Sequence, residues 1–428
     1  MHDVLDLRDM LADEIIQRRE SGHRVDAPGA DAVAAADRAG LERLLAAVEA
    51  SPRDPAWPYD EPPLDATRLA APAPAAPPGD ADLRDRILGA WLGRCAGCAL
   101  GKPVEIWPRT EIRRYLERTG DYPIADYLPA DDPAPAGFPP LNRDWAGSVR
   151  GRIRGMPRDD DIDYTILGLH ILERHGPGFT AADVGAAWLS RFPFTAVFTA
   201  ERAAYRNLIL GLAPPETATH VNPYREWIGA QIRVDAYAYA SPGDPGRAAR
   251  MALADASLSH TANGVYGAVW AAALIAAAFT APDMAAALET ALTLVPPRSR
   301  LAEALRGVAS LHASGCDWEA ARDVLEERHG ALSPVHAINN AAVVASALLW
   351  GEGDFTRTIG LAVQGGWDTD CNGATAGSAF GAMHGAGALP AHWTEPLDDR
   401  VRSAVLGFDG ARISALTERT IAVVVGGR

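Results

Sequence analysis

Two short acidic segments, far apart in this 428-residue chain, carry residue types that could do chemistry. The first segment is Asp159-Asp160-Asp161, and the second is Asp368-Thr369-Asp370. Two carboxylates about 4 Å apart repel each other by roughly 4 kcal/mol at an effective dielectric constant near 20. If the two segments meet in the fold, a hard cation held by oxygen ligands would offset this repulsion. Their composition therefore predicts a divalent-metal site.

Each acidic segment also fits a simpler role at the start of a helix. Aspartate caps helix N-termini, and acids in the first turn complement the helix dipole. For residues 159–161 a cap and a metal site fit equally well, and Asp163 is expected in solvent. Residues 368–370 favour the metal site, because they follow two glycines and precede a helix of small residues near the expected domain centre. Histidines do not cluster near either segment, which favours Mg²⁺, Mn²⁺ or Ca²⁺ over Zn²⁺.

Three further features have both a functional and a structural interpretation. The segment GCALGKPVE at 97–105 ends a helix, and Glu105 would project from the following turn, although a lone glutamate is usually a surface residue. Cys95 and Cys98 have C-x-x-C spacing without a second pair, so packing is favoured over zinc or redox chemistry. His260 precedes an alanine-rich segment, where a core or capping histidine is the default interpretation.

Helical periodicity predicts the elements that position these residues. From residue 81 onward helical patterns dominate and alternating strand patterns are scarce, so we expect an all-α domain over 81–428. The expected helices are 81–100, 111–118, 160–174, 181–191, 199–210, 247–258, 262–279, 283–293, 299–313, 317–328, 337–350, 355–363 and 371–384. Residues 119–157, rich in proline and glycine, indicate a long loop of the kind that often acts as a lid.

Residues 1–80 are expected to form a separate N-terminal helical arm. Residues 3–50 have the pattern of two amphipathic helices, and residues 51–80 contain nine prolines, which is typical of an extended surface segment. From the sequence the arm either packs on the main body or is tethered to it.

Composition narrows the class of protein and of partner. The formal net charge of −15 disfavours nucleic acid and anionic membrane surfaces as main partners, but it does not exclude a small molecule that carries phosphate. Four cysteines do not make a disulfide scaffold in a chain of this length. The N-terminus lacks the pattern of a secretory signal, and residues 261–282 favour a buried helix over a membrane span. We expect a cytoplasmic bacterial protein, whose oligomeric state the sequence leaves open.

In this order, the segments resemble the motifs of the ADP-ribosylglycohydrolase family. The family pattern has a helix that ends in G-D-A-L-G-x-P-x-E, then T-D-D-T, then T-H, and finally G-G-D-T-D-T. Residues 97–105, 159–162, 259–260 and 365–371 occupy those places. The resemblance implies an orthogonal bundle of helices, a centre of two Mg²⁺ or Mn²⁺ ions, and hydrolysis of an N- or O-glycosidic bond at a ribose C1.

The resemblance also implies roles for individual residues. Glu105 would be catalytic, and His260 would lie near the ribose. Five aspartates would ligate metal: Asp159, Asp160, Asp161, Asp368 and Asp370. Substrate contacts would come from His260, Gly366, Thr369 and Cys371.

This chain departs from the family pattern at several positions. Asp159, Ile162 and Cys371 stand where the family has threonine, Cys98 replaces an aspartate, and Trp367 replaces a glycine. The five aspartates would carry −5 against +4 for two divalent ions, so one of the two metal sites could be altered. The substrate could be an ADP-ribosylated protein, or a small N-ribosyl metabolite or nucleoside. A non-enzymatic structural protein on the same fold is the third alternative.

Overall fold

The computed structural model describes residues 4–67, 69, 72–129 and 137–426, and this part of the chain is all α-helical. The N-terminal helices are α1 (Leu7–Glu20), α2 (Ala30–Ala35) and α3 (Arg38–Glu49). The body contains α4 (Asp80–Gly101), α5 (Arg109–Thr119), α6 (Asp160–His175), α7 (Ala181–Arg191), α8 (Thr199–Ile209), α9 (Glu216–Thr219), α10 (Asp235–Tyr239), α11 (Pro245–Ala256), α12 (Ala262–Ala278), α13 (Met284–Leu292), α14 (Arg300–Ala313), α15 (Trp318–His329), α16 (Ala337–Trp350), α17 (Phe355–Gln364), α18 (Thr369–His384), α19 (Ala391–Thr394) and α20 (Ile413–Gly426). Short 3-10 helices, including η1 (Lys102–Val104), η2 (Trp145–Gly147) and η5 (Ile228–Arg233), lie between them. The described residues form isolated β-bridges but no strand, so the predicted all-α class is confirmed.

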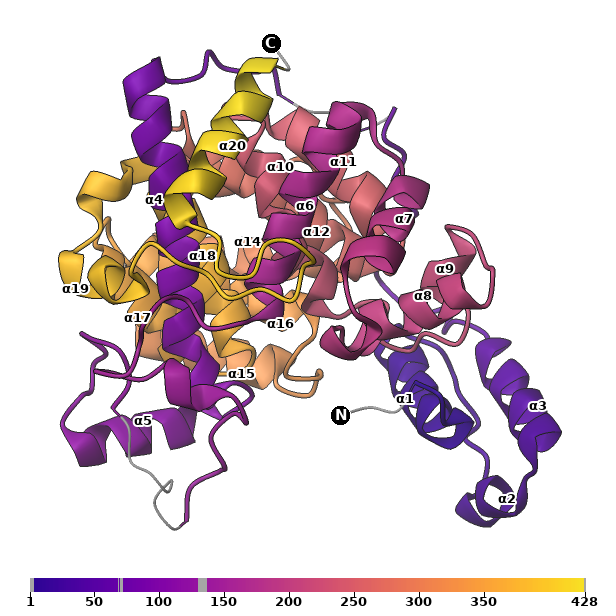
Figure 1. The fold of residues 1–428 in the computed structure, drawn as a ribbon. Coiled ribbons are helices and arrows are strands. Elements are labelled where there is room, and N and C mark those ends of the chain that lie inside the picture. Colours follow the sequence, from indigo (N-terminus) through magenta and orange to yellow (C-terminus); the bar gives the residue numbers. More distant parts are fainter. Residues whose placement is uncertain (1–3, 68, 70–71, 130–136, 427–428) are drawn as a thin grey trace.

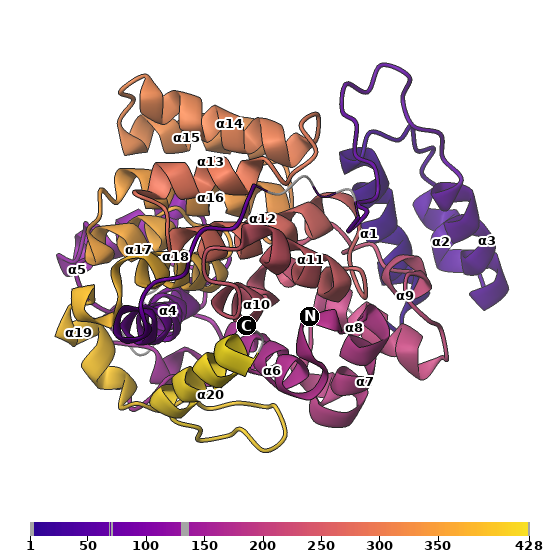
Figure 2. The same ribbon diagram turned by 90° about the horizontal axis from the view of Figure 1, so that it is seen from above.

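The centre of the body is a pair of antiparallel helices, α4 and α18, whose backbones touch (Figures 1 and 2). Glycines at every fourth position of one helix face glycines of the other: Gly89, Gly93 and Gly97 on α4, and Gly373, Gly377 and Gly381 on α18. A Cβ atom added at Gly93 would lie 2.2 Å from the carbonyl oxygen of Gly377. Only glycine allows so close an approach of two backbones. The pairing brings the end of α4, just before Glu105, to the start of α18, just after Asp368.

The start of α6 is held against this central pair by one buried arginine of α4. Arg94 is fully buried, and its guanidinium donates to the carbonyl oxygen of Asp161 over 2.8 Å. It also forms ion pairs with the carboxylates of Asp161 at 3.1 Å and of Asp235 on α10 at 3.0 Å. Breaking a buried ion pair by removing one partner costs about 3–5 kcal/mol, so Arg94 strongly restrains the position of α6. In the same first turn of α6, Asp163 is buried and accepts hydrogen bonds from Ser403 and Arg158, so its expected exposure is wrong.

The N-terminal arm packs on the body. α1 and α3 share a small apolar core of Leu11, Leu41, Leu45 and Val48, at one side of the molecule near α8 and α9 (Figures 1 and 2). Three helices, rather than the expected two, lie within residues 3–50, because residues 30–35 form the short helix α2.

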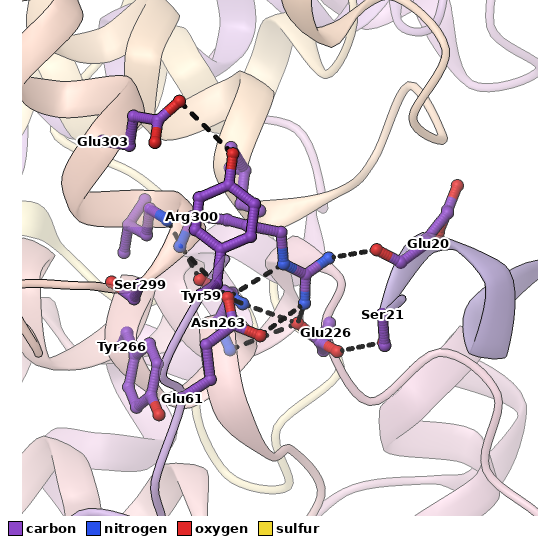
Figure 3. Close-up of polar contacts among 12 residues, drawn as sticks. Glu20, Ser21, Tyr59, Glu61, Glu226, Asn263, Tyr266, Ser299, Arg300 and Glu303 are labelled. Carbon is purple, nitrogen blue, oxygen red and sulfur yellow. Dashed lines mark hydrogen bonds and ion pairs between the residues drawn. The ribbon is translucent and has the colours of Figure 1, made fainter. Parts of the chain in front are cut away.

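Buried polar contacts fasten the arm to the body (Figure 3). The guanidinium of Arg300 lies between two carboxylates, with Glu61 of the arm at 2.8 Å and Glu226 of the body at 2.6 Å. Ser21 of the arm donates to Glu226 over 2.8 Å, and Glu14 pairs with Arg225 at 2.6 Å. Because these groups are buried and paired across the interface, the arm is an integral layer of the described structure.

A search of the described helices for a long apolar segment finds none able to cross a membrane. The alanine-rich α12 is instead a core helix, and all of its residues after Ala262 are buried. The loop expected at 119–157 is present between α5 and α6, although residues 130–136 lie outside the described structure.

Candidate metal centre

The two acidic segments meet at the ends of α6 and α18. Three overlapping groups each have their potential ligand atoms within 4.8 Å of one another. These groups are Cys98 with Asp159 and Asp161, Asp161 with Asp370 and Cys371, and Glu105 with Asp368 and Asp370. The glycine-mediated pairing of α4 with α18 explains the third group, and Arg94 explains why α6 joins it. The arrangement can hold a divalent cation among buried oxygen and sulfur ligands.

The side of this cluster formed by α6 already has positive partners. The ammonium nitrogen of Lys102 lies 2.5 Å from Asp159, and both side chains are buried. Burial alone would raise the pKa of Asp159, but Lys102, the Asp161 amide and Arg158 together outweigh burial and hold this pKa below its ordinary value. Asp161 is paired with Arg94 at 3.1 Å. Asp159 also caps α6 by accepting a hydrogen bond from the amide of Asp161, so the capping interpretation is correct for this residue.

The side formed by Glu105, Asp368 and Asp370 is compensated less, because Lys102 acts on Glu105 and Asp370 without forming an ion pair with either. In the described structure none of these three carboxylates forms an ion pair, and Asp368 Oδ1 and Asp370 Oδ1 are buried without a hydrogen-bond partner. Burial and the charge of Asp370 raise the pKa of Asp368 and of Glu105 well above their ordinary values. Burial and Asp159 raise the pKa of Asp370 to about 6. Unpaired buried carboxylates are costly, so these oxygens fit the ligand set of a hard cation.

One carboxylate of the cluster and one beside it are half-buried, and they mark its more exposed side. Glu105 and Asp160 are half-buried, whereas Asp159, Asp161, Asp368 and Asp370 are buried. Asp160 lies outside the three close groups, and burial together with Asp159 raises its pKa to about 8. The long loop reaches this side, because the amide of Asn142 donates a hydrogen bond to the Glu105 carboxylate.

The predicted substrate-side residues of the second segment lie at the cluster, and two of them have clear structural roles. The hydroxyl of Thr369 donates to the carbonyl oxygen of Gly101 over 2.8 Å and so ties α18 to α4. Gly366 has a φ of +73°, which glycine adopts without strain. The following Trp367 also has a positive φ, +64°, and its ring stacks against Arg322 at 3.8 Å. Cys371 lies beside Asp161 and Asp370.

His260 belongs to a neighbouring network. Its Nδ1 lies 2.8 Å from the hydroxyl of Ser259, and its Nε2 lies 4.0 Å from Glu201. Glu201 pairs with the buried Arg233 at 2.7 Å. Burial and then Arg233 lower the pKa of His260 well below its ordinary value, which keeps the imidazole neutral. In the described structure Ser259 is the side-chain hydrogen-bond partner of the His260 ring, and the buried Nε2 atom has none. The contact of His260 with a substrate stays a prediction.

Several residues that shape the cluster were not predicted from the sequence. Lys102 and Arg94 compensate the α6 carboxylates, and Asn142 orients Glu105. Asn340 at the start of α16 accepts a hydrogen bond from the amide of Asp368 over 3.1 Å. Lys102 could have been identified from the sequence, because it lies within the 97–105 motif. The two asparagines could not, because their contacts are made across the fold.

The model of the family described as ADP-ribosylglycohydrolase matches residues 79–426. Comparison with curated proteins gives no match. One solved structure, described as an ADP-ribosylglycohydrolase-related protein complex, is 21% identical, with a TM-score of 0.45 over 81% of this chain and 100% of that chain. Because the family model spans most of the chain, including all three acidic groups, this protein belongs to the ADP-ribosylglycohydrolase family.

Proposed function

We propose that this protein is a divalent-metal-dependent hydrolase that cleaves an N- or O-glycosidic bond at a ribose C1. Family membership supports a glycohydrolase-like activity. The observation that carries the finer proposal is the buried group of Glu105, Asp368 and Asp370, in which two carboxylate oxygens have no hydrogen-bond partner. A structural protein has no need of such a repulsive arrangement, because an apolar core would be more stable there.

The donor set fits Mg²⁺ or Mn²⁺. Carboxylate oxygens from Asp368, Asp370 and Glu105 are the hard ligands that these ions prefer, and the described groups contain no histidine. Asp161 and Cys371 lie close to Asp370 and adjoin this ligand set. When bound, a divalent ion supplies positive charge that lowers the pKa of water and helps to hold sugar hydroxyls.

Glu105 is the residue we propose as general base. It is half-buried at the more exposed side of the cluster, and Asn142 fixes the orientation of its carboxylate. Its pKa, raised by burial and by Asp370, lies well above the ordinary glutamate value. A carboxylate held at the edge of the metal site can accept a proton from an attacking water. The surrounding aspartates would favour the positive charge that develops at C1 as the leaving group departs.

Two substrate classes are proposed, an ADP-ribosylated side chain and a small N-ribosyl metabolite or nucleoside. The small-molecule class is supported by the contact of Asn142 with Glu105, which places part of the long loop against the more exposed side of the cluster. Access from that side suits a compact substrate better than a folded protein. The net charge of −15 disfavours nucleic acid and anionic membrane surfaces as main partners.

The test is a mass-spectrometric screen of chelator-treated protein, with and without added Mg²⁺ or Mn²⁺. The candidates are ADP-ribosyl-arginine, ADP-ribosyl-serine, O-acetyl-ADP-ribose and simple nucleosides, and the product sought is the free ribosyl sugar. Glu105→Gln and Asp370→Asn should abolish metal-dependent release of this sugar. Asp409→Asn, which changes an exposed carboxylate paired with Arg402, is the matched control. Absence of Mg²⁺ and Mn²⁺ binding in calorimetry, with no candidate cleaved, would contradict the proposed function and favour the non-enzymatic alternative.

A further inference from the structure

Lys102 bears on how many metal ions the cluster can bind. It is the only lysine in the chain, so the other 39 of the 40 basic residues are arginine. Lysine and arginine differ at a cation site, because an ammonium is a compact point charge whereas a guanidinium is a flat fork. The chain therefore places its one compact organic cation within the acidic cluster.

Lys102 is held there by backbone packing. It follows Gly101, where an added Cβ atom would lie 2.2 Å from the carbonyl oxygen of Thr369 and 2.4 Å from the amide of Asp370. From this position its ammonium reaches Asp159 at 2.5 Å. Asp159 itself is fixed by its capping bond to the amide of Asp161. The contact thus joins two rigid helix ends.

Local charge divides the cluster into two unequal positions. The group of Cys98, Asp159 and Asp161 holds two carboxylates, and each is already paired with a basic side chain, Lys102 or Arg94. The group of Glu105, Asp368 and Asp370 holds three carboxylates, and two of their buried oxygens lack any partner. An added divalent ion would gain most at the second group and least at the first, where it would compete with two fixed cations.

We propose that the Lys102 ammonium permanently occupies the first cation position, and that the protein binds a single divalent ion at Glu105, Asp368 and Asp370. This inference rests on the proposed metal-dependent function and specifies its metal content. It also makes Lys102 a positioning residue, since its charge keeps Asp159 in place without an ion.

The test is the number of Mn²⁺ ions bound per chain, measured by equilibrium dialysis with metal analysis and by electron paramagnetic resonance. Wild-type protein should bind one ion and give the spectrum of an isolated Mn²⁺. Lys102→Met keeps the side-chain length but removes the charge, so it should bind two ions and show spin coupling between them. Lys102→Arg keeps a positive charge and is the matched control, with one ion expected.

Other ion counts would contradict either this inference or the proposed function. Two ions in wild-type protein, or one ion in a folded Lys102→Met protein, would overturn the inference and leave the proposed function standing. No ion in wild-type protein would instead remove the proposed function. Circular dichroism establishes that each variant is folded.

A second measurement uses unaltered protein and does not depend on any variant. Because Lys102 is the only lysine, protein labelled with ¹⁵N-lysine has one side-chain ammonium resonance. With saturating Mg²⁺ this resonance should remain protected from exchange with water, since the ammonium stays on Asp159. A rapidly exchanging resonance at saturating Mg²⁺ would show that the ion displaces Lys102, and the inference would be wrong.

Discussion

Substitution of Gly97 by alanine should loosen the metal centre from within the core. A Cβ atom at this position would lie 1.9 Å from the carbonyl oxygen of Gly373 on α18. Real Cβ atoms essentially never come closer than 3.0 Å, so α4 and α18 would have to separate locally by about 1.1 Å. The obstacle is backbone, which cannot turn aside as a side chain can. Separation would also move Glu105, which follows α4, away from Asp368, which precedes α18.

The expected cost follows from this displacement. Overpacking a core typically costs about 1–3 kcal/mol, and a backbone clash belongs at the upper end, near 3 kcal/mol. Unfolding entropy of about 2.1 cal/mol/K per residue amounts to about 0.7 kcal/mol/K over the matched residues 79–426. For a cooperative transition the melting temperature should therefore fall by about 4 °C. Displacing a metal ligand through its supporting shell typically costs roughly 10–100-fold in affinity, so Mn²⁺ binding should weaken by that order.

Differential scanning calorimetry and Mn²⁺ titration would measure the two effects on the same samples. Gly178→Ala is the matched control, because an added Cβ atom there meets nothing within 4 Å, and both of its values should equal those of wild type. If Gly97→Ala melts within 1 °C of wild type and binds Mn²⁺ equally well, the close backbone contact does not position the centre.

Three other perturbations test separate parts of the structure. Arg300→Met would leave Glu61 and Glu226 buried without a cation, which should lower the free energy of unfolding by about 3–5 kcal/mol. Limited proteolysis should then remove the N-terminal arm faster than in wild type. An unchanged rate of cleavage would contradict the role of Arg300 in holding the arm on the body. Burial lowers the pKa of His336 to about 3, so between pH 6.5 and 3 the unfolded chain binds a proton that the folded protein does not. The free energy of unfolding should therefore fall by about 2 kcal/mol from pH 7 to pH 5. His336→Asn keeps a capping side chain on α16, so it should remove this part of the pH dependence, as measured by urea titrations. Asn142→Ala should lower kcat and also weaken Mn²⁺ binding, because it removes the hydrogen bond that orients the Glu105 carboxylate. Unchanged kcat and unchanged Mn²⁺ binding together would contradict this role for Asn142.

Local sequence patterns determined much of the secondary structure and the identity of the acidic segments. The small-residue segments predicted α12 and α18, and helical periodicity predicted α4 and α6 to within a residue or two of their bounds, because helix formation depends mainly on neighbours in sequence. Acidic composition alone also identified the two segments that form the cluster. These features are short-range, so they can be read without knowledge of the fold.

Contacts between segments far apart in the sequence determined how the site is assembled and which of its charges are paired. In the described structure Asp159 forms an ion pair with a lysine whereas Asp370 forms none, and this difference depends on how α4, α6 and α18 cross. The crossing of α4 with α18 depends on glycines whose partners lie nearly three hundred residues away. The burial of Asp163 and the separate network of His260 likewise arise from neighbours that the sequence does not place side by side. A residue's type sets the charge it can carry, but the dielectric and the partners around it exist only once the chain has packed.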